Sequence, residues 1–229
     1  MATNEQHYCF IPHRTEKEAA GTREKAAVLN GVKWNPGDVV TVRFMEGDRG
    51  LQQRVEAVAR EWMQHANVRL SFIDEGDADI RIAFQQGNGS WSYLGTDCRT
   101  IGADEPTMNY GWLTPDSPDD ELRRVVLHEF GHALGLIHEH QNPEGGIRWN
   151  RDAVIRDLSG PPNNWDLPTI ENNIFKKYDK NAVTASDVDG ESIMMYPIPK
   201  AWTLDGFSAD LNSELSPLDK EIVRKSYPR

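Results

Sequence analysis

Residues 128–138, HEFGHALGLIH, contain three histidines whose spacing suits a metal ion. His128 and His132 are four residues apart, so on a helix they project from one face with Cβ atoms about 5 to 6 Å apart. Two imidazoles at this separation can bind one zinc ion at about 2.0 to 2.1 Å each. Gly135 can adopt a left-handed conformation at little steric cost, which would end the helix and bring His138 toward the same ion. Three nitrogen ligands would leave one coordination position open for water.

Glu129 directly follows the first of these histidines and is rotated about 100° around the same helix. From there its carboxylate can reach a water held by the metal without being a ligand itself. An activated water beside a carboxylate can hydrolyse a peptide bond, with the carboxylate moving the proton from the water to the leaving amine. The sequence contains no GxSxG elbow, P-loop or dinucleotide-binding fingerprint that would indicate a competing chemistry.

The stretch HEFGHALGLIH resembles the HExxHxxGxxH signature of the metzincin zinc endopeptidases. The resemblance implies that His128, His132 and His138 bind one catalytic Zn²⁺. It also implies that Glu129 serves as the general base and general acid of the reaction.

A second stretch, SIMMY at residues 192–196, is similar to the methionine-containing turn of the same clan. By this resemblance, Met194 lies beneath the zinc as an apolar floor. Tyr196 matches a residue that, in the astacin and serralysin branches, can approach the zinc and swing out to stabilise the reaction oxyanion. Simple packing beneath the turn is the alternative role for Tyr196.

Among the branches, this sequence is most similar to the astacin family of peptidases. HEH at residues 138–140 and VDGESIMMY at residues 188–196 resemble its blocks around the third ligand and the methionine turn. The similarity implies that Glu139 supports the site without binding the metal. We expect His140 to have a structural or cleft-edge role, because a fourth protein ligand would close the water position. The sequence departs from the astacin pattern at three positions: Leu136, Asn142 and Met195.

The remaining sequence predicts the elements that position these residues. Pro118 to Leu134 should form the helix that carries the histidines, with Ser117 as N-cap and acidic residues in the first turn, where the helix dipole favours them. Ser216 repeats this start signal for a last helix that ends near Ser226. Hydrophobic periodicity predicts strands at residues 39–45, 68–73, 78–84 and 107–112, and helices at residues 16–29, 51–66, 151–158 and 168–178. The Gly- and Ser-rich stretch before residue 107 could supply an edge strand that accepts an extended peptide.

These elements predict an α+β fold similar to a metzincin catalytic domain. We expect a twisted mixed sheet with two long helices in an N-terminal lobe, and a loop-rich C-terminal lobe that ends in a helix. The catalytic domain is predicted to span residues 37–229, with an upper lobe of about 37–135 and a lower lobe of about 136–229. Residues 1–36 would be an N-terminal arm, either a pro-segment or an integral extension of the fold.

Cys9 and Cys98 are the two cysteines of the chain. They could form one disulfide, remain free thiols, or leave Cys9 to cap the zinc as a thiolate that holds the enzyme latent. Of these three interpretations, the sequence favours the disulfide. The metal site cannot be a multi-cysteine zinc cage in any of them.

Composition narrows the classes of partner. The 229 residues carry a formal net charge of -11, which disfavours nucleic acid and anionic lipid. No apolar run approaches the roughly 18 residues needed to span a bilayer, and the first residues lack the apolar region of a leader peptide. Residues 187–191, DVDGE, are a candidate for calcium, but a solvated loop is the favoured interpretation.

Taken together, the sequence predicts a zinc-dependent metalloendopeptidase that acts on proteins or peptides as a monomer. The resemblance suggests an extracellular location. The alternatives are a catalytically silent zinc-containing binding module and an exopeptidase on the same scaffold.

Overall fold

A five-stranded sheet forms the centre of the N-terminal lobe (residues 31–135) in the computed structural model, which describes residues 6–12, 31–143, 145–178 and 188–229. The strand order is β2-β1-β3-β5-β4, with parallel pairing everywhere except between β4 and β5. The strands are β1 (Val39–Phe44), β2 (Arg69–Phe72), β3 (Ile80–Ala83), β4 (Ser90–Ser92) and β5 (Met108–Tyr110). The sheet is therefore mixed, as predicted, and β4 forms the expected edge.

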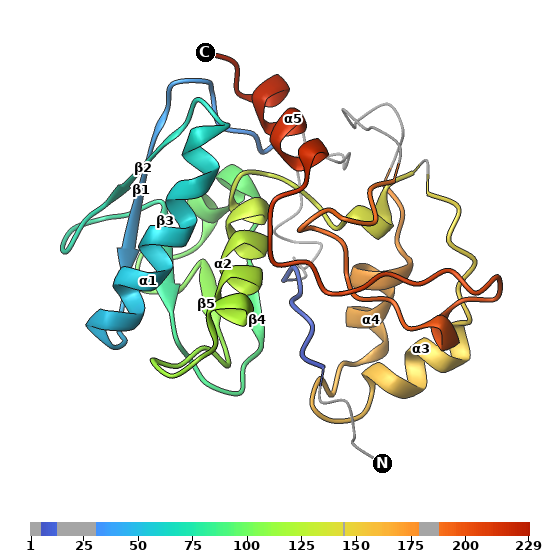
Figure 1. The fold of residues 1–229 in the computed structure, drawn as a ribbon. Coiled ribbons are helices and arrows are strands. Elements are labelled where there is room, and N and C mark those ends of the chain that lie inside the picture. The colour runs from blue at the N-terminus through green and yellow to red at the C-terminus, as the bar shows by residue number, and fades with distance from the viewer. Residues whose placement is uncertain (1–5, 13–30, 144, 179–187) are drawn as a thin grey trace.

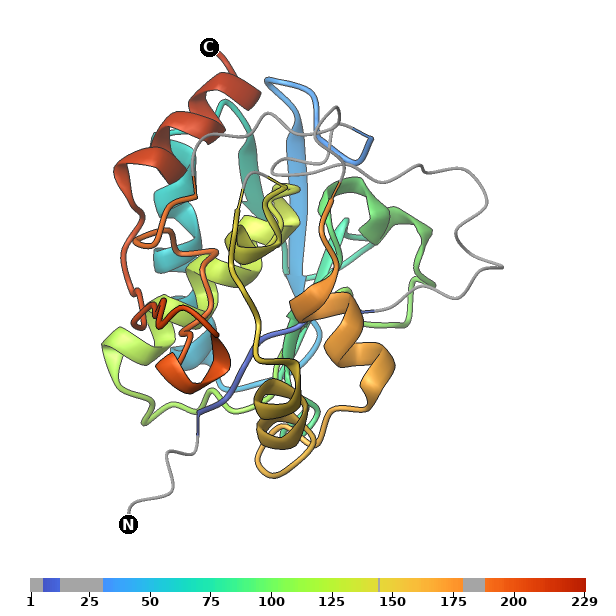
Figure 2. The same ribbon diagram turned by 90° about the vertical axis from the view of Figure 1, so that its right-hand side faces the viewer.

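Two helices lie side by side on one face of this sheet (Figures 1 and 2). The first, α1 (Arg49–Ala59), buries Leu51, Val55 and Val58 and continues as the 3-10 turn η1 (Arg60–Gln64). The second, α2 (Asp119–Ala133), is buried along most of its length and carries the HEFGH stretch. Apolar side chains from the sheet, α1 and α2 form the main core of the protein.

The start of α2 differs from the prediction. Pro118 occupies the N-cap position and provides no side-chain cap. The Ser117 hydroxyl instead accepts a hydrogen bond from the Thr114 N–H at 2.9 Å, so it closes the preceding turn rather than capping the helix. Three acidic residues still occupy the first turn, where the helix dipole stabilises negative charge.

The C-terminal lobe (residues 136–229) contains α3 (Arg151–Leu158), α4 (Leu167–Ile170) and a π-helical turn, η4 (Glu171–Phe175). The sequence predicts a single helix over residues 168–178, but α4 and η4 divide this region and the chain is no longer helical from Lys176. The last helix, α5 (Pro217–Ser226), begins at the predicted N-cap Ser216, and the Asp219 side chain completes a capping box with it. It packs back on the N-terminal lobe, where Asn67 N–H donates to the Tyr227 carbonyl at 3.0 Å.

Residues 6–12, hereafter the N-terminal segment, run in an extended conformation between the two lobes (Figures 1 and 2). Phe10 N–H donates to the Ser90 carbonyl at 3.0 Å, and Phe10 forms a parallel bridge with Trp91 of β4. The segment thus extends the sheet beyond its edge strand. The helix predicted at residues 16–29 lies outside the described residues.

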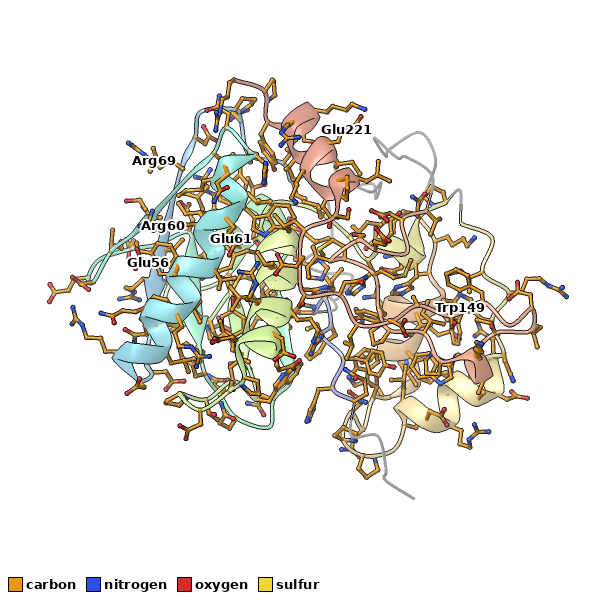
Figure 3. The ribbon with its side chains drawn as sticks, in the orientation of Figure 1. Glu56, Arg60, Glu61, Arg69, Trp149 and Glu221 are labelled. Atoms are coloured by element: carbon orange, nitrogen blue, oxygen red, sulfur yellow. The ribbon has the colours of Figure 1, made fainter. Side chains whose placement is uncertain are left out.

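Ion pairs join charged side chains around α1 and η1 in the N-terminal lobe. Arg60 pairs with Glu56 one turn earlier at 2.6 Å, and Arg123 of α2 pairs with Glu61 at 2.5 Å. Figure 3 shows Glu56, Arg60 and Glu61 around α1, on the opposite half of the molecule from Trp149. Within the described ranges, no helix has the length and apolar character that a membrane span requires.

Candidate functional site

Helix α2 and the turn after it bring His128, His132 and His138 together. One ring nitrogen from each lies within 4.8 Å of the ring nitrogens of the other two, and all three side chains are buried. Gly135 has a φ of 84°, the left-handed conformation predicted for it, and its N–H donates to the His132 carbonyl at 2.7 Å. The chain then reverses, so that His138 faces the two histidines of the helix.

The Nδ1 atom of each ring faces an oxygen. These contacts are His128 to the Ile193 carbonyl at 2.9 Å, His132 to the Leu136 carbonyl at 2.7 Å, and His138 to Gln141 Oε1 at 3.1 Å. Because these oxygens can only accept hydrogen bonds, each Nδ1 carries the ring proton. Each Nε2 is therefore unprotonated and carries a free lone pair.

These unprotonated nitrogens fit a cation. His132 Nε2 and His138 Nε2 are 3.2 Å apart, and two lone pairs at that distance repel each other. His128 Nε2 is buried and, within the described part of the chain, has no hydrogen-bond partner. Burial also lowers the pKa of all three histidines, which keeps the rings neutral. Neutral imidazoles with oriented Nδ1 protons are the donor set that zinc takes in proteins.

Glu129 is fully buried beside this cluster. A Glu129 carboxylate oxygen, the Cys9 sulfur and a His128 ring nitrogen all lie within 4.8 Å of one another. Burial raises the pKa of Glu129 to about 8, against the opposing effects of the Cys9 thiol and the Arg124 guanidinium. Neither carboxylate oxygen has an N–H or O–H donor among the described residues. Cys9 thus lies beside Glu129, and the Glu129 side chain could meet a water or a substrate once Cys9 has moved away.

The predicted methionine turn packs directly against this centre. Met194 is buried, and a Cβ added to Gly131, next to His132, would lie only 2.4 Å from its sulfur. The Tyr196 ring centroid is 4.2 Å from that of His138, and its hydroxyl donates to the Cys9 carbonyl. Both side chains thus contact the α2 histidine region, and Tyr196 also contacts the N-terminal segment.

Glu139 and His140 lie next to the cluster but outside it. Glu139 Oε1 accepts hydrogen bonds from Asn142 Nδ2 at 3.1 Å and from the Asp189 N–H at 3.2 Å, so it joins the turn after His138 to the loop before the methionine turn. Burial raises the pKa of Glu139 to about 7. His140 Nε2 lies 2.8 Å from the Asn173 carbonyl of η4.

Cys9 and Cys98 do not form the favoured disulfide in the structure: both are free, buried thiols. They lie in different environments, which explains why they are not joined. Cys9 lies against Glu129 and His128, whereas Cys98 belongs to η2 (Gly95–Thr100), near the charges of Asp79 and Arg99. Burial raises the pKa of the Cys9 thiol well above its usual range, and the Glu129 charge raises it further.

Several residues that hold the site were not predicted from the sequence. Trp34 Nε1 donates to the Ala133 carbonyl at 2.8 Å, and the Tyr227 hydroxyl donates to the Leu134 carbonyl at 2.6 Å. These bonds satisfy carbonyls that the end of α2 leaves without helical partners. Aromatic residues far away in sequence carry no local signal for this role, because their pattern indicates only core packing.

The loop at Asp189 gives calcium no direct support. Asp189 Oδ2 accepts from the Ser216 hydroxyl at 2.5 Å, and Asp189 Oδ1 accepts from the Glu191 N–H at 3.0 Å. Asp187 lies outside the described residues. The two carboxylate oxygens of Asp189 thus serve the loop and the start of α5.

Comparison with known proteins agrees with this geometry. The family profile described as Astacin, a peptidase family, matches residues 29–222. The chain belongs to the astacin family. The solved structure of myroilysin is 42% identical, has a TM-score of 0.86, and is matched over 89% of this chain and 99% of that chain. The α+β metzincin fold and the astacin branch predicted from the sequence are therefore confirmed.

More distant relatives agree at the level of family and fold. The zinc metalloproteinase nas-30 of Caenorhabditis elegans is 28% identical over 140 residues, which is 60% of this chain and 17% of that protein. The chain thus spans less than a fifth of this curated relative. The hatching enzyme HCE-1 of Oryzias latipes is 18% identical with a TM-score of 0.58, over 86% of this chain and 94% of that chain, and shows the shared fold alone.

Proposed function

We propose that this astacin-family chain is a zinc-dependent endopeptidase whose N-terminal segment holds it latent. The observation that carries the proposal is the set of three buried Nε2 lone pairs beside a carboxylate that lacks an N–H or O–H donor among the described residues. His128, His132 and His138 would hold one Zn²⁺, and three protein ligands leave a coordination position open. Residues 37–229 would form the catalytic domain and residues 1–36 the N-terminal arm.

Peptide-bond hydrolysis at this site would need only a few side chains beyond the metal ligands. When bound, zinc supplies the Lewis acidity that makes water a nucleophile near neutral pH. Glu129 would accept the proton that the attacking water releases and return it to the departing amine nitrogen. The C–N bond then breaks to leave a carboxylate and an amine, with no acyl-enzyme. The Tyr196 hydroxyl would donate a hydrogen bond to the developing oxyanion, and Met194 would form the apolar floor.

Cys9 is the basis for the proposed latency. Its sulfur lies within 4.8 Å of a His128 ring nitrogen and of a Glu129 carboxylate oxygen, so it could become a further ligand of a zinc ion held by the histidines. A cysteine sulfur is a good zinc ligand as the thiolate, and a fourth protein ligand excludes water. Tyr196 is occupied at the same time, because its hydroxyl donates to the Cys9 carbonyl. Activity would therefore require the N-terminal segment to leave the cleft.

Proteins or peptides would be the substrates of the activated enzyme. The edge strand β4 supports this, since it already pairs with an extended segment of this chain. We further propose that the enzyme acts outside the cell, as the family resemblance suggests, and that it is a monomer.

The test is a pair of measurements on the full chain and its Glu129→Ala variant. Each should bind one mole of zinc per mole of chain. After the N-terminal segment has been displaced, only the wild type should cleave a protein substrate, and analysis of new end groups should show internal cuts. Zinc binding without cleavage by either protein would instead indicate a silent binding module, and release of terminal residues alone would indicate an exopeptidase.

A further inference from the structure

The C-terminal lobe holds the N-terminal segment by its main chain, through two asparagine side chains. Asn163 Oδ1 accepts a hydrogen bond from the Tyr8 N–H at 3.0 Å, and Asn163 Nδ2 donates to the Gln6 carbonyl at 3.0 Å. The Asn163 carboxamide thus accepts from one main-chain N–H and donates to the main-chain carbonyl two residues earlier. A neighbouring β-strand would make the same two kinds of hydrogen bond. Asn163 lies in the loop between α3 and α4.

The second carboxamide, Asn173, lies on the other side of Cys9. Asn173 Oδ1 accepts from the Ile11 N–H at 2.8 Å, and Asn173 Nδ2 lies 3.5 Å from the Ile11 carbonyl and 3.0 Å from that of Thr169. Asn173 is 1% exposed and belongs to η4, a π-helical turn. Such turns are rare and often occur at functional sites. The His140 contact to the Asn173 carbonyl holds this turn beside the histidine cluster.

The two carboxamides lie on either side of the reaction centre. Tyr8 and Ile11 are three residues apart, about 10 Å in an extended chain, and Cys9 lies between them, beside His128. In the same segment, the Phe10 N–H donates to the Ser90 carbonyl at 3.0 Å. The main chain of the N-terminal segment is therefore hydrogen-bonded both to β4 and to two asparagines of the C-terminal lobe.

We propose that Asn163 and Asn173 form a main-chain clamp that binds the N-terminal segment in the latent chain and an extended peptide substrate in its place once that segment has left. The bonds of the clamp reach N–H and carbonyl groups that every peptide possesses, so they do not depend on the side chains of residues 6–11. When the segment leaves, the buried Asn173 carboxamide loses a partner, and a substrate main chain would restore it. A cavity of about 430 Å³, lined by Tyr8, Asn163 and Trp165 among others, would give a peptide access to Asn163. This inference rests on the proposed function for its substrate half only.

The first experiment measures opening of the segment without using activity. The full chain with zinc bound is treated with iodoacetamide, and the alkylation of Cys9 and Cys98 is followed separately by peptide mapping. Asn163→Ala and Asn173→Ser should each speed the alkylation of Cys9 about tenfold, the change expected for lost hydrogen bonds of this kind. Cys98 should react at its wild-type rate, because it reports unfolding of the N-terminal lobe rather than movement of the segment.

Two neighbouring asparagines serve as matched controls. Asn164 Nδ2 donates to the Pro162 carbonyl, and Asn172 Oδ1 faces Lys176. Asn164 has a φ of 50°, which glycine adopts without strain, so Cys9 should be alkylated at the wild-type rate in Asn164→Gly and in Asn172→Ala. Equal Cys9 rates in all four variants would overturn the clamp. Faster alkylation of Cys98 together with Cys9 in both clamp variants would also overturn it, because the side chains would then act on overall stability.

The second experiment tests the substrate half on chains whose Cys9 has been alkylated, since the added group prevents the segment from reseating. With an unrelated unstructured peptide as substrate, Asn163→Ala and Asn173→Ser should raise KM about tenfold and change kcat less than about twofold, and both controls should match the wild type. Unchanged KM in the clamp variants would overturn the substrate half. If the alkylated wild type hydrolyses no peptide, the proposed function fails, and the alkylation rates still decide whether the clamp exists.

Discussion

His128 is joined to Asp219 through the main chain of one residue, Ile193: the Ile193 carbonyl lies 2.9 Å from His128 Nδ1, and the Ile193 N–H donates to Asp219 Oδ2 at 2.8 Å. Asp219 also accepts from the Ser192 hydroxyl at 2.7 Å and from the Ser216 N–H at 2.9 Å. The capping box of the last helix therefore fixes the turn that orients a predicted zinc ligand.

Asp219→Ala should weaken zinc binding as well as stability. It removes the acceptor for three donors in a buried environment, and residues that orient metal ligands typically change metal affinity about 10- to 100-fold. We expect zinc to transfer to a chelator at least about tenfold faster than from the wild type. Asp48→Ala is the control, because Asp48 caps α1 through Leu51 at 3.0 Å, remote from the histidines. Equal zinc loss from the two variants would contradict the positioning role of Asp219.

Cys9→Ala should relieve the proposed latency. Without the sulfur, the N-terminal segment keeps its hydrogen bonds but cannot contribute a zinc ligand, so substrate should displace it more easily. Hydrolysis of a peptide by the full chain should rise on the order of tenfold or more. Cys98→Ala is matched, because it also removes a buried free thiol but at a distance from the site. The same activity in wild type, Cys9→Ala and Cys98→Ala would rule out capping by Cys9.

Tyr196→Phe should lower kcat of the activated enzyme by about 10- to 100-fold and leave KM and zinc content nearly unchanged, as expected for loss of an oxyanion donor. Removing the hydroxyl of another buried tyrosine gives the control. The Tyr110 hydroxyl has no partner in the described parts of the chain, so Tyr110→Phe should keep full activity. If Tyr196→Phe also keeps full kcat and changes only thermal stability, packing beneath the turn is its role.

The sequence predicted the histidine cluster and most of the elements because the signals were local. Residues 128–138 place three ligands within one helix and one turn, and Ser216 and Asp219 complete a capping box three residues apart. The prediction failed at the start of α2, where two local partners compete for one hydroxyl. The Ser117 hydroxyl accepts from the Thr114 N–H, three residues earlier, and closes a turn instead of capping α2.

The partners of Cys9 show a second limit, which long-range contacts set. Its neighbours His128 and Glu129 are more than a hundred residues away in sequence, so the favoured disulfide could be excluded only once the path of residues 6–12 was known. Of the two clamp asparagines, Asn163 lies in a loop and Asn173 in a π-helical turn, and each stands next to another asparagine, so no local pattern distinguishes them from their neighbours.

Acid stability should depend on Asp79, which joins β1, β3 and η2. Burial raises its pKa, but hydrogen bonds from Arg99 and Thr41 outweigh burial, and the pKa lies below its ordinary value. A carboxyl with a depressed folded-state pKa stabilises the protein above its unfolded-state pKa of about 3.9 and loses this contribution as pH falls through the folded-state pKa. Asp79→Asn should therefore lower Tm at pH 6 and converge with the wild type toward pH 2.

This difference in Tm is measured by thermal unfolding between pH 2 and pH 6. A chelator is present in every sample to remove the effect of zinc on stability. Asp77→Asn, at an exposed neighbouring position, should follow the wild-type curve throughout. A constant difference in Tm between Asp79→Asn and the wild type across this range would mean that the Asp79 charge does not contribute.

Gly131 and Met194 should be energetically coupled. A Cβ at Gly131 would lie 2.4 Å from the Met194 sulfur and 3.4 Å from Trp62 Cζ2, so Gly131→Ala must displace the methionine. Overpacking of this kind costs about 1 to 3 kcal/mol, against about 1 kcal/mol that alanine gains over glycine within a helix. The single variant should therefore be destabilised by up to about 2 kcal/mol in urea unfolding. In the Gly131→Ala, Met194→Ala double variant the clash is absent, so the two effects should fall short of additivity by at least about 0.5 kcal/mol. Additive effects would mean that Met194 does not pack against α2 at the position of the predicted zinc floor.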